Sequence, residues 1–152
     1  MNVVRRSPFA LAFLLVSVGV ILSGRQAPGI NVERSGLALH GYDAVAYLTK
    51  GAAVKGRTEF EHRWQNALWR FESREHRDRF AQSPEQYAPQ FGGYCAWAVS
   101  RGYTADIDPE AWRVIDGKLY LNYSKRVQRR WEQDVAGNIA KGHANWPGVL
   151  SK

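Results

Sequence analysis

The sequence predicts a small single α+β domain of two β-hairpins, short helices and a C-terminal amphipathic helix. Two stretches alternate apolar and polar residues around a turn-forming pair, which is the pattern of a hairpin. Short helical patterns begin at Asp or Ser side chains that can cap them. The chain of 152 residues has 6 Trp, 7 Tyr and 6 Phe, enough to build an apolar core without disulfides.

Residues 1–29 are predicted to be an export signal or an N-terminal anchor. Arg5 and Arg6 precede residues 9–23, which contain no charge, and this order is typical of a signal peptide. The uncharged run is shorter than the roughly 20 apolar residues that cross a membrane. We therefore expect the protein to be exported. If the signal is not cleaved, residues 8–24 are the only part expected to contact the membrane.

The net charge is modest once the signal is set aside. The formal value of +7 includes three arginines in residues 1–29, which contain no acid, so the rest of the chain carries +4. We expect these cations to be spread over a solvated surface. Because an exported protein meets little nucleic acid, no nucleic-acid partner is predicted.

The first ordered element is expected to be a short helix. Residues 30–39 are a polar leader, and the domain is expected to span residues 40–147. The helix is predicted within residues 39–51, because Asp43 can cap its start and Gly51 can end it.

The first hairpin is predicted in residues 58–73. Phe60, His62 and Trp64 alternate with charged residues on the first strand. The alternation resumes after Asn66, a residue that tolerates the positive φ of a tight turn.

Two helical segments should follow this hairpin. Ser73 is predicted to cap a helix that runs to about Gln82, with Phe80 directed inward. Ser83–Pro84 then opens another helical turn, since proline favours the first helical position.

The second hairpin is predicted in residues 110–124, around Asp116–Gly117, a pair that strongly favours a two-residue turn. Ser124 then caps a final helix, predicted to be continuous until Gly142 because its apolar residues recur every four positions. No internal repeat and no second domain are evident. The recurring apolar residues are Val127, Trp131, Val135 and Ile139.

Three segments resemble the exported, stand-alone YHS-domain proteins of bacteria. They read GYDAVAYLTKGAAVKG, WRFESREHRDRFAQSPEQYAPQFGGYCAWAVSRG and DGKLYLNYSKRVQRRWEQD. The resemblance covers about His40 to Pro147, and the combination of segments makes it specific. It implies one compact unit of hairpins and helices, located in the periplasm or on the periplasmic face of the inner membrane. It also implies metal-handling envelope proteins as partners.

The same resemblance bears on metal chemistry. YHS domains of metal-transporting ATPases carry a Cys-Pro-x-Cys-like start and a Phe-Cys-Ser-x-x-Cys segment where the hairpin meets the helix. In this chain Glu72 and His76 stand at the two cysteine positions of the second segment, and residues 41–45 contain no thiol. The family's soft-metal site is therefore absent in its usual form, because thiolates are the ligands that select soft ions.

Cys95 is the only cysteine, which excludes an internal disulfide and a zinc site of several thiolates. We predict a buried apolar side chain behind Gly92–Gly93, because free cysteine is commonly buried and an exposed thiol would oxidise after export. Two alternatives stay open: a metal ligand, with His62 as the histidine expected to face the same interior, and a reactive thiol.

The remaining ligand candidates are histidines and one acid. His62 lies on an apolar strand face, where a hydrogen-bonded core histidine is the commoner role. Glu72 and His76 are four residues apart, so one helix face would present both to a harder ion such as zinc or iron. His76 is otherwise expected to be exposed. His40 and His143 lie in loops and are ligands only if the fold brings them together.

These observations predict a non-enzymatic envelope protein that binds or handles a metal ion or a small ligand. No Gly-x-Ser-x-Gly elbow, phosphate-binding loop or haem motif occurs, so no catalytic residue is assigned. The alternatives are a thiol-dependent redox accessory or enzyme that uses Cys95, and a structural or protein-interaction module. The candidate metal ligands, for copper, zinc or iron, are Cys95, His62, His76 and Glu72, and the candidate ligand-stacking residues are Tyr94, Trp97 and Trp112.

Overall fold

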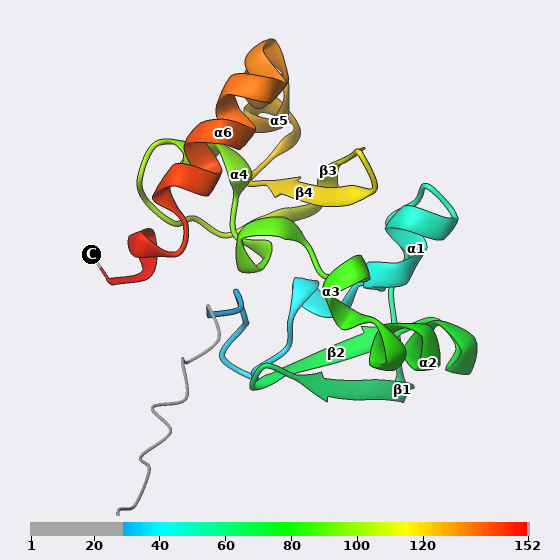
Figure 1. Cartoon of the computed structure of the whole chain (residues 1–152). Coiled ribbons are helices and arrows are strands. Elements are labelled where there is room, and N and C mark those ends of the chain that lie inside the picture. Colours follow the sequence, from blue (N-terminus) through cyan, green and yellow to red (C-terminus); the bar gives the residue numbers. More distant parts are fainter. Residues whose placement is uncertain (1–28, 152) are drawn as a thin grey trace, which may run out of the picture.

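The computed structural model describes residues 29–151, which form an α+β domain with two separate two-stranded antiparallel sheets (Figure 1). The predicted fold class is therefore confirmed. The predicted export signal spans residues 1–29, and all of it except Gly29 lies outside the described residues.

The first half of the molecule is built on a hairpin with helices before and after it (Figure 1). Gln65 and Asn66 have φ values of 49° and 60°, which form the predicted tight turn. The predicted caps Asp43 and Ser73 and the helical turn at Pro84 are confirmed. The elements are α1 (Ala44–Thr49), β1 (Arg57–Trp64), β2 (Ala67–Phe71), α2 (Arg74–Gln82) and α3 (Pro84–Tyr87).

The second half contains the other hairpin, again between helices. Asp116 and Gly117, with φ values of 50° and 72°, form its predicted turn. The short helix α4 precedes this hairpin and was not predicted, because it covers one turn only and the residues before it read as a glycine turn. The elements are α4 (Ala96–Ser100), β3 (Asp108–Ile115), β4 (Lys118–Asn122), α5 (Lys125–Trp131) and α6 (Val135–Asn145).

The two halves repeat one structural unit, which corrects the expectation that the chain has no internal repeat. Each hairpin has a strand of eight residues, a two-residue turn and a strand of five residues. Each sheet also interrupts its register at the same place. A shift of 51 residues carries Arg57–Phe71 onto Asp108–Asn122 and Ser73 onto Ser124. Both serines cap the next helix at 3.2 Å.

Buried aromatic residues follow the same repeat. Phe80 on α2 and Trp131 on α5, also 51 positions apart, are both fully buried at 0 % exposure. Phe80 packs on Trp69 with ring centroids 4.9 Å apart at 34°, and Trp131 packs on Tyr120 at 5.3 Å and 32°. The repeat therefore extends from the backbone to the packing of the core.

The segments before the two hairpins correspond as well. LHGYDAVAYLTKG and FGGYCAWAVSRG share glycine, tyrosine and alanine positions. Leu39–Gly41 and Phe91–Gly93 each have positive φ at three successive residues, with values between 51° and 80°. The chain then enters α1 after Asp43 and α4 after Cys95. These two residues therefore occupy equivalent positions in the two halves.

The C-terminal helix is divided, so the prediction of one continuous helix is wrong. Asp134 interrupts it with a φ of −150°, and its side chain caps α6 by accepting the N–H of Gly137 at 3.0 Å. Gly142 lies inside α6 rather than at its end. A Cβ atom there would lie 2.5 Å from the Phe91 ring, so this glycine lets the ring pack directly on the helix.

Strand β4 connects the two apolar clusters of the core. Leu119 and Leu121 belong to the larger cluster, which also includes residues of α1, β2 and α2. Tyr120 belongs to the smaller one, with Phe91 and Trp131. Because successive residues of a strand face opposite sides, one strand can contribute to both clusters and hold the two halves together.

Candidate metal site around Asp43

Asp43 lies at the start of α1 with no exposed surface, and its two carboxylate oxygens bind different segments. Oδ1 accepts the N–H groups of Val45 at 2.8 Å and Ala46 at 3.2 Å, which is the predicted cap. Oδ2 accepts the N–H of Glu72 at 3.0 Å and lies 2.7 Å from Nδ1 of His76. Asp43 thus links α1 to the junction between β2 and α2.

Glu72 and His76 lie together at this junction, with Oε1 of Glu72 3.6 Å from Nδ1 of His76. His76 is only 7 % exposed, so the expectation of an exposed histidine is wrong. The reason is the bond to Asp43, which holds the ring inside. The Glu72 side chain is partly exposed and also pairs with the ammonium of Lys50.

The three side chains lie close enough together that they could hold a metal ion. Ligand atoms of Asp43, Glu72 and His76 lie within 4.8 Å of one another, and no other group of three or more such residues does so in residues 29–151. Tetrahedral ligands with bonds of about 2.0 Å are about 3.3 Å apart. The separations of 2.7 Å and 3.6 Å from Nδ1 of His76 lie on either side of this value.

Two features of the network compete with a metal ion. The Lys50 ammonium already neutralises part of the charge of Glu72. The Nδ1 atom of His76 already lies at hydrogen-bond distance, 2.7 Å, from Oδ2 of Asp43. An ion would displace the Lys50 ammonium from Glu72 and replace the hydrogen bond between His76 and Asp43, so its binding must exceed what these two interactions contribute.

Sequence reasoning found two of these three residues and missed the third as a ligand. Glu72 and His76 were identified from the cysteine positions of the resembling family, whereas Asp43 was predicted only as a helix cap. The available signal was its place within residues 41–45, the segment where the resemblance implies the first cysteines. Only the fold shows that this segment meets Glu72 and His76.

Cys95 lies outside this group and is buried as predicted, at 1 % exposure. Its Sγ accepts the N–H of Tyr123 at 3.3 Å and donates to Oδ1 of Asn122 at 3.7 Å. His62 packs edge-on against Phe80 with ring centroids 6.1 Å apart. Among the described residues no hydrogen bond joins Cys95 to His62, and neither belongs to a group of three metal ligands.

The repeat explains the position of Cys95. Asp43 accepts the N–H of Glu72, and Cys95 accepts the N–H of Tyr123, which stands 51 positions after Glu72. The counterpart of the histidine, at the same shift, is Val127. The second half therefore has an acceptor that joins its helix to its hairpin but carries no carboxylate or imidazole at the corresponding positions.

Cys95 is expected to be unreactive in the native protein, because burial raises the pKa of its thiol. A thiol reagent at mildly alkaline pH should label Cys95 in guanidinium and leave it unlabelled under native conditions. An added cysteine at the exposed Ser35 is a positive control for the reagent. Native labelling of Cys95 at the rate seen for Ser35→Cys would contradict the structural role and favour the thiol-dependent alternative.

The three candidate stacking residues each pack on another side chain of the protein. They therefore form part of the core and its rim. The pairs are Trp97 with the Arg101 guanidinium (4.1 Å), Trp112 with Tyr47 (5.2 Å) and Tyr94 with Trp146 (6.1 Å).

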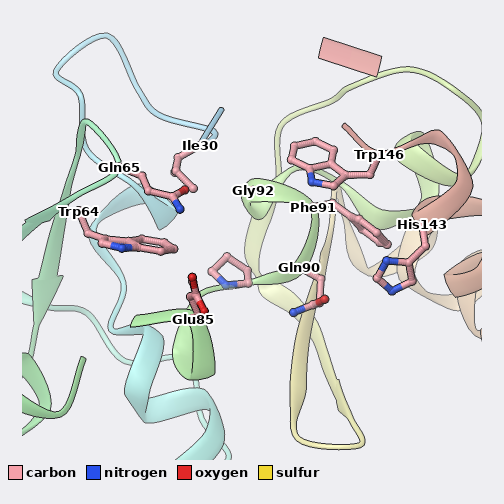
Figure 2. Close-up of a pocket in the computed structure, with 11 residues that line it drawn as sticks. Ile30, Trp64, Gln65, Glu85, Gln90, Phe91, Gly92, His143 and Trp146 are labelled. Carbon is pink, nitrogen blue, oxygen red and sulfur yellow. The ribbon is translucent and has the colours of Figure 1, made fainter. Parts of the chain in front are cut away.

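A separate pocket of about 190 Å³ lies between the two halves (Figure 2). Trp64 and Glu85 line it from the first half, and Phe91, His143 and Trp146 line it from the second (Figure 2). Sequence patterns did not indicate it, because its walls come from segments far apart in the chain. It shares no residue with the Asp43 cluster, so it is a separate place for a small ligand.

The two histidines that were expected in loops are not brought together as ligands, and His143 lies within α6, not in a loop after the last helix. His40 lies between two carboxylates, with Nδ1 3.1 Å from Glu33 and Nε2 2.8 Å from Asp106. His143 packs on the Phe91 ring at 5.1 Å, on the wall of the pocket. His40 thus ties the leader to the loop before β3, and His143 belongs to the boundary between the halves.

No family model matches this chain, and neither a curated protein nor a solved structure was found to be similar to it. Within residues 29–151, every helix is too short or too polar to span a membrane.

Proposed function

We propose that this protein binds a divalent transition-metal ion, zinc or ferrous iron, through Asp43, Glu72 and His76. In this proposal it is a non-enzymatic, YHS-type envelope protein that takes part in metal handling. The supporting observation is the meeting of three ligand atoms within 4.8 Å. All three lie in the segments where the family resemblance implies cysteines.

The donor set suits such an ion better than a soft one. Two carboxylates and an imidazole replace thiolates, which favours zinc or iron over cuprous copper. The N–H groups of Val45 and Ala46 hold the Asp43 carboxylate in place while its other oxygen faces the site. Such outer contacts orient ligands in metal sites. Glu72 is the partly exposed member of the group, since Asp43 and His76 are buried.

Direct metal binding tests the proposal. Titration of the purified full-length chain with zinc, and with ferrous iron under anaerobic conditions, should show one ion per chain. Affinity should rise with pH, because protons compete with metal ions for imidazole and carboxylate ligands. Glu72→Gln and His76→Gln should each weaken binding by more than the roughly 10–100-fold that losing an outer contact costs. Cys95→Ser should leave binding unchanged.

A gain of affinity provides a sharper test. Lys50→Gln should tighten metal binding about 2–5-fold, since the ammonium competes with the ion for Glu72 and an exposed pair is worth up to about 1 kcal/mol. Lys141→Gln on α6 removes the same charge from an exposed site and is the matched control.

Two results would overturn the proposal. One is equal, substoichiometric metal in the parent chain and in the Glu72 and His76 variants. The other is loss of binding in Cys95→Ser alone, which would transfer the site to the thiol.

A further inference from the structure

The positive charge of the domain is concentrated in one segment, which corrects the expectation that it is spread. Residues 113–131 contain six Lys or Arg and one acid, a net of +5. The rest of the chain from residue 29 onward contains twelve Lys or Arg and thirteen Asp or Glu, a net of −1. One short segment therefore accounts for the whole excess of positive charge.

The fold places these cations on α5 and the adjoining β3–β4 hairpin. Helix α5 lies at the opposite end of the molecule from the β1–β2 sheet (Figure 1). Arg113 and Lys125 line one surface groove together with Trp112. All six side chains are exposed. We call them the basic surface: Arg113, Lys118, Lys125, Arg126, Arg129 and Arg130.

The structural repeat supplies an internal comparison. On α2, Glu75 pairs with Arg79 and Asp78 pairs with Arg77, each at 2.7 Å. At the two acidic positions α5 carries Arg126 and Arg129 instead. Equivalent helices of one fold thus differ in charge, so the fold itself does not require a basic α5.

The cations of the basic surface are largely unpaired. Within the described residues only Arg113 has a carboxylate partner, Glu132 at 3.3 Å. Like charges at neighbouring positions of a helix destabilise it slightly. Repulsion between these side chains therefore lowers the stability of the domain slightly. Binding of an anionic partner would relieve that repulsion.

Helix α5 stays docked on the domain, so contact with a partner must be electrostatic. Its apolar face is used internally, because Trp131 is fully buried and Val127 packs against the core. The one large exposed aromatic beside it is Tyr123, at 59 % exposure. A tyrosine next to cations is suited to the headgroup level of a bilayer.

We propose that the basic surface docks the domain on an anionic phospholipid bilayer. Basic side chains near such a surface each contribute about 1 kcal/mol. The predicted export signal or anchor would deliver the chain to a membrane, which favours lipid over nucleic acid. This inference goes beyond metal binding and is independent of it, since the basic surface shares no residue with the Asp43 site.

Sedimentation with vesicles tests this docking in the full-length chain. Vesicles of phosphatidylglycerol and phosphatidylcholine are compared with phosphatidylcholine alone, which controls for binding through residues 9–23. Arg126→Gln/Arg129→Gln should weaken binding to the anionic vesicles about 25-fold, or about 5-fold for each side chain. Salt raised from about 0.1 M to 1 M shortens the Debye length from about 10 Å to 3 Å and should abolish the preference.

The matched control is Arg34→Gln/Arg74→Gln, which removes the same charge from two exposed arginines of the first half. It should leave the preference for anionic vesicles within about 2-fold, because electrostatic attraction falls off within a Debye length. An equal loss in the control, or a preference that ignores salt, would overturn the proposal. Tighter binding to a single-stranded oligonucleotide than to the vesicles at the same salt would also overturn it.

Discussion

Replacing Asp43 with alanine is expected to lower the free energy of unfolding by about 3–5 kcal/mol, because each buried donor left without its acceptor costs about 1–3 kcal/mol. The carboxylate serves three backbone N–H groups and His76, and it is fully buried. Its loss leaves these donors without a partner and separates α1 from the start of α2. Urea unfolding in the presence of a chelator measures the effect without a contribution from bound metal.

Two further variants separate the functions of Asp43. Asp43→Asn retains one acceptor oxygen, enough to cap α1 but not to accept the N–H of Glu72, so a loss of about 2 kcal/mol is expected. Ser124→Ala removes only a helix cap, with an expected loss of about 1 kcal/mol. If Asp43→Ala costs no more than Ser124→Ala, then Asp43 is a cap alone and the link to His76 contributes nothing.

Phe80→Ala is the second change with a large expected effect, about 3–5 kcal/mol of unfolding free energy. The ring is fully buried and packs on Trp69 at 4.9 Å, Phe71 at 5.1 Å and Trp64 at 5.8 Å. Removing it leaves a cavity that these rigid rings cannot close. Thermal unfolding and urea unfolding should give the same decrease in the free energy of unfolding.

The half-buried Phe60 on β1 is the matched control for this core position. Its ring contacts the Arg57 guanidinium at 5.6 Å at the edge of the sheet. Phe60→Ala should cost about 1 kcal/mol, because much of its surface is already in water. A similar loss for both variants would mean that the aromatic cluster around Phe80 adds nothing beyond ordinary burial.

Elements set by neighbouring residues were predictable. The turns at Gln65–Asn66 and Asp116–Gly117 depend on residues that accept positive φ, and the caps at Ser73 and Ser124 depend on a hydroxyl three positions before an N–H. These interactions are local in the chain. The sequence pattern therefore contains them completely.

Elements set by packing were not predictable. The apolar period continues through the break between α5 and α6, which depends on the cap made by Asp134. Gly142 reads as a helix end, but it is required for contact with Phe91, more than 40 positions earlier. The repeat was missed because the two halves share few identical residues and agree mainly in backbone geometry and burial.

The sequence by itself determined the two hairpins, the helix caps, the burial of Cys95, and Glu72 and His76 as candidate ligands. Only the tertiary structure showed that Asp43, 29 residues before Glu72, completes the group. The physical reason is that a buried carboxylate must satisfy its oxygens with whatever donors the fold brings near it. Those donors come from two segments whose meeting depends on how α1 packs against α2.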